Sequence, residues 1–570
     1  MTLKKVKKSL KWWHSVLFVL ILAIGFLSFV NDDDRNFSIA KNLDIYYTLF
    51  RELNSYYVDE TNPEELVETS IKKMLESLDP YTTYIPESDM ADFRFMTTGE
   101  YGGIGSLITR SDKYIIIAEP YDGFPAAKVG LKAGDKILEI DGKDMVGKAS
   151  SEVSSMLKGT ANTPLKLKVD RPGKSKPITF ELIREKIHIN PVPYYGMVDE
   201  HTGIILLNNF TQGCSNEVRK ALIDLKENYK AKSIILDLRG NPGGLLDDAV
   251  KLVSLFVKKG SEIVSTKGKV KQWDKVYKAI INPVDTIIPI AVLINRGSAS
   301  ASEIVAGSIQ DLDRGVVLGQ RSFGKGLVQT TRSLSYNAKL KVTTAKYYTP
   351  SGRCIQAVDY SNRNEDGSVG LVPDSLINEF TTVAGRKVYD GGGVSPDIMI
   401  PRKEFGNISF ALVGQSMIFD FVTQYLIDKD NVASPDEFVV SDELFNEFKQ
   451  YVISKEGFEY ESETQDLLMK LKTTAKKEGY YTNVKDNFDA LEEGLKLDLV
   501  KDLDLFRTQI SEFIGTEILK RYYYQKGGIL FSLKDDKTVE KATEVLSDSL
   551  EYMGILNGAI ATHAGDKRNK

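Results

Sequence analysis

A group of serines is the part of the sequence best suited to chemistry. Ser298, Ser300 and Ser302 lie in the segment 295–304, directly after an apolar run at 290–294. A serine at a strand-to-helix turn can act as a nucleophile, because a helix N-terminus offers free N–H groups and a partial positive charge. The same hydroxyls can instead cap the following helix. Local sequence does not choose among the three serines.

A lysine between glycines follows the serines. The segment 319–326 has the G-x4-G-K spacing of a phosphate-binding loop, but Gly326 stands where serine or threonine must bind magnesium. Its glycines can instead let the backbone pack tightly around Lys325. Loss of water lowers the pKa of an ammonium group, which makes a lysine a general base near neutral pH. Paired with the serines, Lys325 is a candidate base.

A third segment supplies candidate backbone donors. Residues 236–244 end an apolar run with Asn241, Pro242, Gly243 and Gly244. These glycines permit N–H groups to point into a site, as an oxyanion hole requires. A plain strand-ending turn explains the same residues without chemistry.

Other chemistries find little support. The chain has no G-x-S-x-G elbow and no HExxH, and the two cysteines, Cys214 and Cys354, cannot build a disulfide framework. His188 and His201 adjoin no recognisable motif, so we interpret both as structural. With 74 basic against 79 acidic residues and a net charge of −5, nucleic acid is not expected as a partner. We expect no metal and no cofactor.

The N-terminus predicts a membrane anchor. Residues 1–11 contain five lysines, residues 12–30 carry no charge, and Asp32, Asp33 and Asp34 follow. Nineteen helical residues span about 28 Å, the thickness of a bilayer core. The lysines place 1–11 in the cytoplasm and the rest on the extracytoplasmic (periplasmic) side. A cleaved signal peptide is the alternative, but the end of the run offers no cleavage site. This side of the membrane has no ATP supply, so a nucleotide is not expected.

The elements that must position these residues fall into four further regions. Helical spacing predicts a helical region over 37–95, with a helix that starts after Asn62. Short strands, glycine turns and one helix at 150–157 predict a compact module over 96–186. Alternating strands and helices, with strands at 204–207, 234–238 and 290–294 and a helix at 303–311, predict an α/β core over 187–400. Long charged segments, 462–477 and 486–517 among them, predict a mostly helical C-terminal extension over 401–570.

Seven segments together resemble the carboxyl-terminal processing (tail-specific) proteases, the S41 serine peptidases. The resemblance covers about residues 40–400, and its motifs match in order and spacing. They are Leu78-Asp-Pro-Tyr, Tyr101-Gly-Gly-Ile-Gly105, Asp237-Leu-Arg-Gly-Asn-Pro-Gly-Gly244, Ser298-Ala-Ser-Ala-Ser-Glu-Ile304, Phe323-Gly-Lys-Gly326, Tyr347-Tyr-Thr-Pro-Ser-Gly-Arg353 and Gly391-Gly-Gly-Val-Ser-Pro-Asp397.

The resemblance implies the roles of individual residues. The serine-to-lysine separation in this family assigns Ser300 as nucleophile and Lys325 as base. The supporting glutamine falls on Gln329, which shares a face with Lys325 if the strand there is regular. The oxyanion donors become the N–H groups of Ala301 and of Gly244, the preferred glycine of the 243–244 pair.

The module over 96–186 resembles a PDZ domain inserted ahead of the core. Gly102, Gly103, Ile104 and Gly105 match its carboxylate-binding loop, whose N–H groups can receive a peptide C-terminus while a strand edge pairs with the ligand. Such glycines can also be simple turns. In related enzymes this domain gates access to the dyad, and gating is expected here by analogy alone.

The sequence thus predicts a membrane-anchored serine endopeptidase that cleaves proteins near exposed C-terminal tails. A catalytically silent PDZ scaffold is the alternative, although a scaffold has no need for an intact Ser300, Lys325 and Gln329. The extension over 401–570 carries no chemical motif. Its helices could cap the core, mediate homo-oligomerisation or hold a partner.

Overall fold

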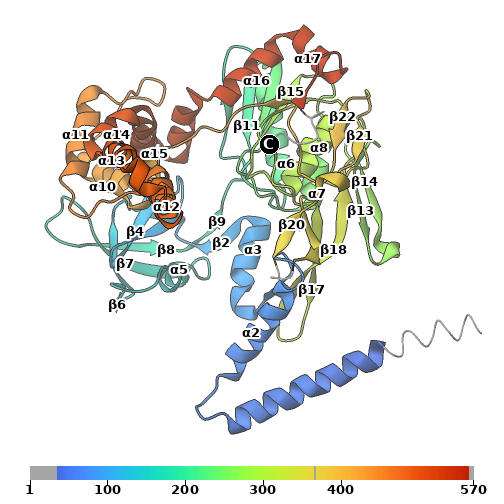
Figure 1. The fold of residues 1–570 in the computed structure, drawn as a ribbon, viewed down its shortest axis with the longest axis horizontal. Helices are drawn as coiled ribbons and strands as arrows, with labels where there is room; N and C mark the ends of the chain where they lie inside the picture. Colours follow the sequence, from blue (N-terminus) through green and yellow to red (C-terminus); the bar gives the residue numbers. More distant parts are fainter. Residues whose placement is uncertain (1–34, 365–367, 564–570) are drawn as a thin grey trace, which may run out of the picture. The chain divides into compact units, whose positions relative to one another are not determined.

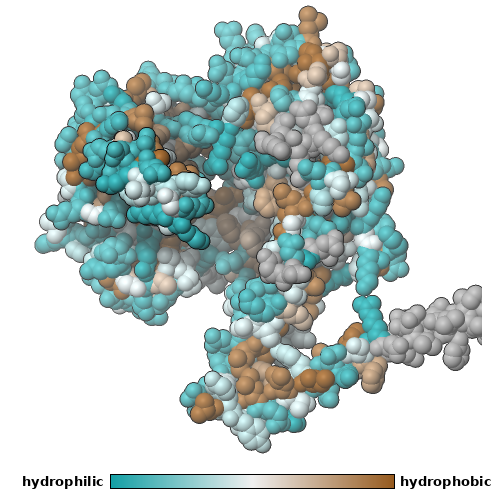
Figure 2. All heavy atoms as spheres, viewed as in Figure 1, coloured by the Kyte–Doolittle hydropathy of each residue, from teal (hydrophilic) through white to brown (hydrophobic). Residues whose placement is uncertain are grey.

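The structure is a computed structural model that describes residues 35–364 and 368–563, in two compact units that divide after Tyr84. The first unit contains a helix over 35–56 and α2 (Pro63–Glu76). The predicted start of α2 is confirmed, because Asn62 Oδ1 accepts the N–H groups of Glu64 and Glu65 and proline occupies the first position. Apolar side chains on the surface of these helices are brown in Figure 2.

The prediction of helices throughout 37–95 is wrong in part. A short strand, β1 (Thr83–Ile85), and a single turn, η1 (Glu87–Asp89), precede α3 (Met90–Thr98). The interruption follows Asp79, whose carboxylate accepts the N–H groups of Tyr81 and Thr82 at 2.8 Å. This turn competes with helix for the same backbone groups.

A β-rich module fills the region predicted to resemble a PDZ domain. Its main sheet has the order β3-β4-β5-β7-β8, and β2 pairs with β9 in a separate two-stranded sheet. The predicted helix, α5 (Ser150–Leu157), and β5 (Lys136–Ile140) have the expected bounds. Strand β3 lies at the edge of the sheet, a position that can pair with an added strand. The other elements are β2 (Glu100–Gly103), β3 (Ser106–Ser111), β4 (Tyr114–Pro120), α4 (Pro125–Lys128), β6 (Lys143–Asp144), β7 (Pro164–Asp170), β8 (Ile178–Ile183) and β9 (Glu185–His188).

The core is built on a second sheet, of order β10-β11-β12-β15-β16-β23, in which all pairs but the first are parallel. The predicted double burial is confirmed, because Ile234 and Leu236 face one apolar cluster and Ile235 faces another. The parallel arrangement brings the loops after β12, β15 and β16 to one edge. The elements are β10 (Tyr194–Met197), β11 (Thr202–Leu206), α6 (Cys214–Glu227), β12 (Ser233–Asp237), α7 (Leu246–Ser254), β15 (Ile290–Ile294), α8 (Ala301–Asp311), β16 (Val316–Gly319) and β23 (Ile398–Met399).

The core also contains antiparallel ribbons. Strand β18 pairs with both β13 and β17, and β17 begins two residues after Lys325. The ribbons comprise β13 (Glu262–Gly268), η2 (Lys271–Trp273), β14 (Lys275–Lys278), β17 (Leu327–Ser333), β18 (Lys339–Tyr348), β19 (Val358–Arg363), β20 (Val369–Leu371), η3 (Asp374–Leu376), β21 (Glu379–Thr381) and β22 (Lys387–Tyr389).

The C-terminal region is helical, as predicted, but the segment 486–517 is divided among three helices. The first helix of the three ends at Gly494, and Asp498 caps the next one by accepting the N–H of Lys501. The helices are α9 (Asn407–Gly414), α10 (Met417–Tyr425), α11 (Asp442–Ile453), α12 (Glu463–Lys477), α13 (Lys485–Gly494), α14 (Leu499–Leu505), α15 (Arg507–Leu533), α16 (Lys537–Ser547) and α17 (Ser549–Leu556), with the turn η4 (Tyr481–Val484).

The last two helices complete the core. Val539, Val545 and Ile555 of α16 and α17 belong to the apolar cluster on the second face of the parallel sheet (Figure 1). The Tyr552 hydroxyl accepts the N–H of Ile290 at 3.1 Å, at the first residue of β15. Part of the C-terminal extension therefore belongs to the folded core.

The predicted membrane segment, 12–30, lies outside the described residues. Among the helices of the described part of the chain, none is both long and apolar enough to cross a membrane.

Arg386, in the loop 382–397, pairs with two buried carboxylates, and its guanidinium also donates to the Gln310 carbonyl of α8 at 2.8 Å. The Arg386 guanidinium contacts Asp313 at 2.7 Å and Asp397 at 2.6 Å, and both pairs are almost wholly buried. The adjacent Lys387 pairs with Glu379, and both of these side chains are exposed.

Replacing Arg386 with methionine is expected to destabilise the core by about 3–5 kcal/mol, because two buried carboxylates lose their counter-charge. Lys387→Met removes the same charge from the next residue and is expected to cost less than about 1 kcal/mol. Thermal unfolding of both variants tests this. Equal melting temperatures would contradict it.

Candidate active site

Ser300 lies at a strained turn between β15 and α8. It is the N-terminal cap of α8 with φ 55° and ψ −110°, a conformation that costs about 1–3 kcal/mol outside glycine. A close neighbour enforces the turn. A Cβ on Gly243 would stand 2.6 Å from the Ala299 oxygen and 2.9 Å from Ser300 Cβ, so only glycine fits there. Such strain is typical of functional turns.

The hydroxyl groups of the other two serines of the cluster are hydrogen-bonded to backbone carbonyls. Ser298 Oγ donates to the Leu238 carbonyl at 2.8 Å and Ser302 Oγ donates to the Asn241 carbonyl at 2.9 Å, and both side chains are fully buried. They hold the turn to the loop after β12. Of the three, only Ser300 is partly exposed. This difference favours Ser300 as nucleophile, a choice that local sequence could not make.

One buried carboxylate organises the site, and sequence reasoning missed it. Glu303 Oε2 accepts the backbone N–H groups of Ser300 and Lys325, both at 2.8 Å. Its Oε1 accepts Ser322 Oγ at 2.5 Å and the Gly324 N–H at 2.7 Å. The backbones of the two candidate catalytic residues therefore bind the same oxygen, which places their backbone nitrogens within about 6 Å of each other. Its place at the third position of α8, in a capping-box spacing, was the available signal.

Burial sets the charge state of Glu303. The side chain is wholly buried, and loss of water raises its pKa to about 7, although the four hydrogen bonds act in the opposite direction. Tyr347 adds to the same cluster, because its hydroxyl donates to the Ser300 carbonyl at 3.2 Å. Burial raises the pKa of Tyr347 well above its ordinary value, and the nearby Glu303 adds to that rise.

The glycines around Lys325 serve close packing, as predicted. A Cβ on Gly324 would lie 2.4 Å from Ala357 Cβ, and one on Gly326 would lie 2.8 Å from the backbone nitrogen of Gln356. The Gly326 N–H donates to Gln356 Oε1 at 2.7 Å. The loop that carries Lys325 is therefore held between Glu303 and this neighbouring segment.

Gln329 lies on β17, which begins at Leu327, so Lys325 precedes the strand. The pairing of β17 with β18 shifts its register between Val328 and Gln329, where β18 contributes the extra residue, Thr344. The condition of one regular strand over 325–329 is therefore not met, and the i to i+4 argument for Lys325 and Gln329 does not apply. The Gln329 amide donates to Thr343 Oγ1 at 3.2 Å. Its catalytic role stays a prediction.

The N–H groups of Ala301 and Gly244 are the two candidate oxyanion donors. Among the residues that the structure describes, no acceptor is found for the N–H of Ala301 or of Gly244. The Gly243 N–H, in contrast, is bound to Asn241 Oδ1 at 2.9 Å. This agrees with the preference for Gly244 over Gly243 as the second oxyanion donor.

The glycine loop of the β-rich module is tightly packed. Gly102 and Gly103 belong to β2 and pair with β9, and Ile104 is buried in the apolar core of the module. Gly105 has φ 71° and lies against Phe124. The loop leads directly into the edge strand β3.

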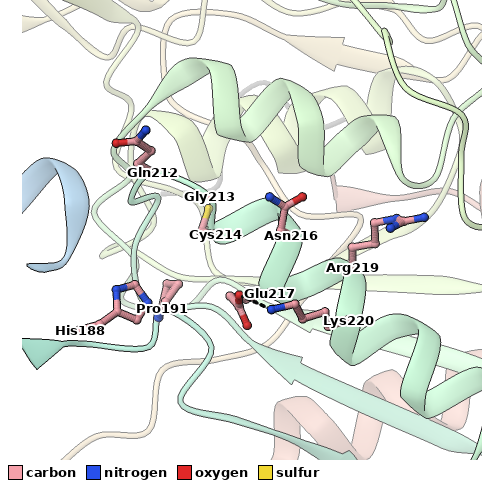
Figure 3. Close-up of a pocket in the computed structure, with 9 residues that line it drawn as sticks. All are labelled: His188, Pro191, Gln212, Gly213, Cys214, Asn216, Glu217, Arg219 and Lys220. Carbon is pink, nitrogen blue, oxygen red and sulfur yellow. Dashed lines mark hydrogen bonds and ion pairs between the residues drawn. The ribbon is translucent and has the colours of Figure 1, made fainter.

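A separate cavity of about 380 Å³ lies at the start of α6 (Figure 3). Neither Ser300 nor Lys325 is among the residues that line it. His188, Cys214 and Glu217 contribute to its wall. Cys214 is buried, which raises the pKa of its thiol to about 12, so this sulfur is not a nucleophile near neutral pH. Cys214 and Cys354 are both free. Within the described ranges, no three or more His, Cys, Asp or Glu side chains gather in a metal-binding group.

Three family models match the chain. Peptidase family S41 matches residues 201–374, the PDZ domain matches 94–170, and the family described as "Probable PDZ-protease, C-terminal helical domain" matches 408–546. The last match includes most of the extension, for which the sequence alone left three roles open.

Two of the similar proteins with a known description are proteases. A carboxy-terminal-processing protease of Bartonella bacilliformis is 39% identical over 378 residues, which are 66% of this chain and 83% of the relative. A probable CtpA-like serine protease of Staphylococcus aureus is 33% identical over 71% of this chain and 80% of its own. Among solved structures, the photosystem II D1 C-terminal processing protease is 29% identical. The match covers 62% of this chain and 92% of that protein, with a TM-score of 0.34. The PDZ domain of a Vibrio cholerae carboxy-terminal protease, in complex with peptide, is 32% identical, with coverage of 16% and 99% and a TM-score of 0.15.

The raised pKa of Glu303 predicts a pH dependence of stability. Between its ordinary value of 4.5 and about 7, the folded core holds a proton that the unfolded chain has released. The stability this proton supplies is present below pH 4.5 and is lost as the pH rises through 7. Glu303→Gln cannot titrate. The stability of the wild type relative to Glu303→Gln should therefore fall by a few kcal/mol across that window.

Urea unfolding of both proteins at pH 5 and at pH 8 measures this difference. Glu303→Gln is expected to have a lower free energy of unfolding at every pH, because its amide NH₂ group would face N–H donors. The informative quantity is therefore how the difference between the two proteins changes with pH. A difference that stays constant would contradict the raised pKa.

Proposed function

The chain belongs to the carboxy-terminal-processing serine proteases of peptidase family S41, and from this premise we propose that Ser300 and Lys325 form its catalytic dyad and that its PDZ domain binds the C-terminal tails of its substrates. The observation that carries the dyad is the shared carboxylate, Glu303, whose one oxygen holds the backbone of both residues. Positioning of this kind supplies much of the rate in a covalent mechanism.

The chemistry needs no group from outside the chain. Lys325 in its neutral form takes the proton of Ser300 Oγ as this oxygen attacks the scissile carbonyl, and Gln329 orients the lysine amine. The N–H groups of Ala301 and Gly244 stabilise the oxyanion of the tetrahedral intermediate. The amine leaves with a proton from Lys325, an acyl-enzyme remains on Ser300, and water then hydrolyses it by the same steps.

Tail recognition rests on the edge strand of the PDZ domain. Strand β3 has a partner on one side only, β4, and α5 contributes Val153 and Leu157 to the same apolar core as Ile104. An extended peptide can add to the free edge while its carboxylate meets the N–H groups of the loop before β3. The residues of α5 beside this edge are apolar, which favours apolar C-terminal side chains in the ligand.

The silent scaffold is the weaker proposal. A chain that only bound tails would have no need for the strained backbone of Ser300 or for a buried carboxylate beneath it, since both cost stability.

We further propose that residues 12–30 anchor the protein in the cytoplasmic membrane, with the protease on the periplasmic side. The lysines at 1–11 and the uncharged length of 12–30 support this orientation.

Replacing Ser300 or Lys325 with alanine is expected to lower cleavage of an unstructured protein with an apolar C-terminus by at least about a thousandfold. The full chain is assayed in detergent, with substrate loss followed on gels. Ser302→Ala is the matched control: it removes a hydroxyl two residues away and should lower the melting temperature while cleavage persists. Cleavage that survives both dyad substitutions would refute the dyad. A loss seen only with Ser302→Ala would shift the nucleophile.

The anchor predicts that the full chain sediments with membranes after cell lysis and is extracted by detergent, whereas a chain that begins at residue 31 and carries a cleavable export signal stays in the soluble fraction. Mass spectrometry of the mature N-terminus distinguishes the alternative. A mature protein that begins near residue 31 would show that the segment is cleaved.

A further inference from the structure

The loop that carries Lys325 also presents a large apolar side chain to solvent. Phe323 precedes the lysine by two residues, and 52% of its surface is exposed. Single exposed apolar residues are common on protein surfaces and need no explanation. The two neighbours of this one, Ser322 and Gly324, are however buried, and both bind the Glu303 carboxylate. The exposed ring therefore belongs to the active-site loop itself.

Hydrogen bonds fix the backbone of Phe323 beside the serine turn. The Phe323 N–H donates to the Ser298 carbonyl at 3.0 Å. The Gly324 N–H donates to Glu303 Oε1 at 2.7 Å, and the Ser300 N–H donates to the other oxygen, Oε2, at 2.8 Å. Because both oxygens belong to one carboxylate, the backbone nitrogens at 324 and 300 lie within about 8 Å of each other. A ring on this backbone is close enough to contact a substrate bound at the nucleophile.

The backbone that carries the ring has no room to withdraw it. The Ser322 N–H donates to the Val394 carbonyl at 3.0 Å, and the Val394 N–H donates to Ser322 Oγ at 2.7 Å. A Cβ on Gly393 would stand 2.7 Å from the Ser322 carbonyl oxygen, so this neighbouring segment packs directly against the loop. The exposure of the Phe323 ring is therefore a fixed property of the folded core.

We propose that Phe323 is the apolar wall against which the protease places a substrate residue at the scissile bond, and that it gives the enzyme a preference for an apolar side chain there. This inference rests on the proposed dyad and deepens it, because it states which kind of side chain the cleaved bond carries.

The preference follows from what a bound substrate does to the exposed ring. Attack requires the scissile carbonyl carbon to lie about 3–3.5 Å from Ser300 Oγ, which brings the two residues that share the bond beside the loop at 322–325. An apolar side chain that covers the ring removes apolar surface of both partners from water. A polar side chain in the same contact would lose hydrogen bonds to water. One methylene group in an enclosed pocket changes kcat/KM by about 10- to 200-fold, so a wall that is open on one side should give about tenfold.

The test uses the full chain in detergent. Mass spectrometry first locates a bond that the wild type cleaves in an unstructured protein, and peptides with that bond carry leucine or serine on one side of it and then on the other. At one of these positions the wild type should cleave the leucine peptide with a kcat/KM about tenfold higher, and Phe323→Ala should reduce this ratio to about one. Phe323→Leu should keep most of the preference. Phe410→Ala is the matched control, since Phe410 of α9 is 54% exposed, and it should leave the ratio unchanged.

The ratio separates substrate contact from support of the loop, because a merely structural defect lowers the cleavage of both peptides equally. Equal losses in Phe323→Ala, an unchanged ratio, or a wild type that prefers leucine at neither position would each overturn the inference and leave the dyad intact. If the wild type cleaves no peptide, or if Ser300→Ala still cleaves, the dyad itself fails, and the inference fails with it.

Discussion

The position of one carboxylate inside the core constrains the backbone at both Ser300 and Lys325. Glu303 belongs to α8, in which every residue is buried, so its charge is kept out of water at a considerable cost. Four donors offset that cost, and three of them are backbone N–H groups that belong to Ser300, Gly324 and Lys325. Because an unpaired donor in this position would be expensive, the turn at Ser300 and the loop at Lys325 have little freedom to separate.

The rest of the core follows from this requirement. Because the strands are parallel, the loops after β12, β15 and β16 lie at the same edge of the sheet. Glycines in these loops let the backbones approach one another closely. Gly243 lies against the Ser300 turn, and Gly324 and Gly326 lie against the segment at 356–357. Ser298 and Ser302 bind the loop after β12 from below. Each contact is short-range, but together they hold three loops that are far apart in the chain.

The C-terminal region is joined to this site by charge as well as by apolar packing. Arg239, in the loop after β12 that also contains Gly243 and Gly244, contacts both Asp237 at 2.6 Å and Asp536 at 2.7 Å. Asp536 in turn caps α16, and α16 and α17 cover the second face of the parallel sheet. The extension is therefore in part a structural component of the protease core, and the catalytic sheet would expose apolar surface without it.

The sequence by itself determined the order of the regions, the strands at 234–238 and 290–294, the cap at Asn62 and the peptidase family, because these depend on local pattern and on motifs of fixed spacing. It did not determine which serine is accessible, that Glu303 binds the backbone N–H groups of both Ser300 and Lys325, or that Lys325 lies before β17 begins. Each of these depends on contacts between segments distant in the chain. Burial and hydrogen-bond satisfaction decide such contacts, and both are properties of the folded molecule that no local pattern contains.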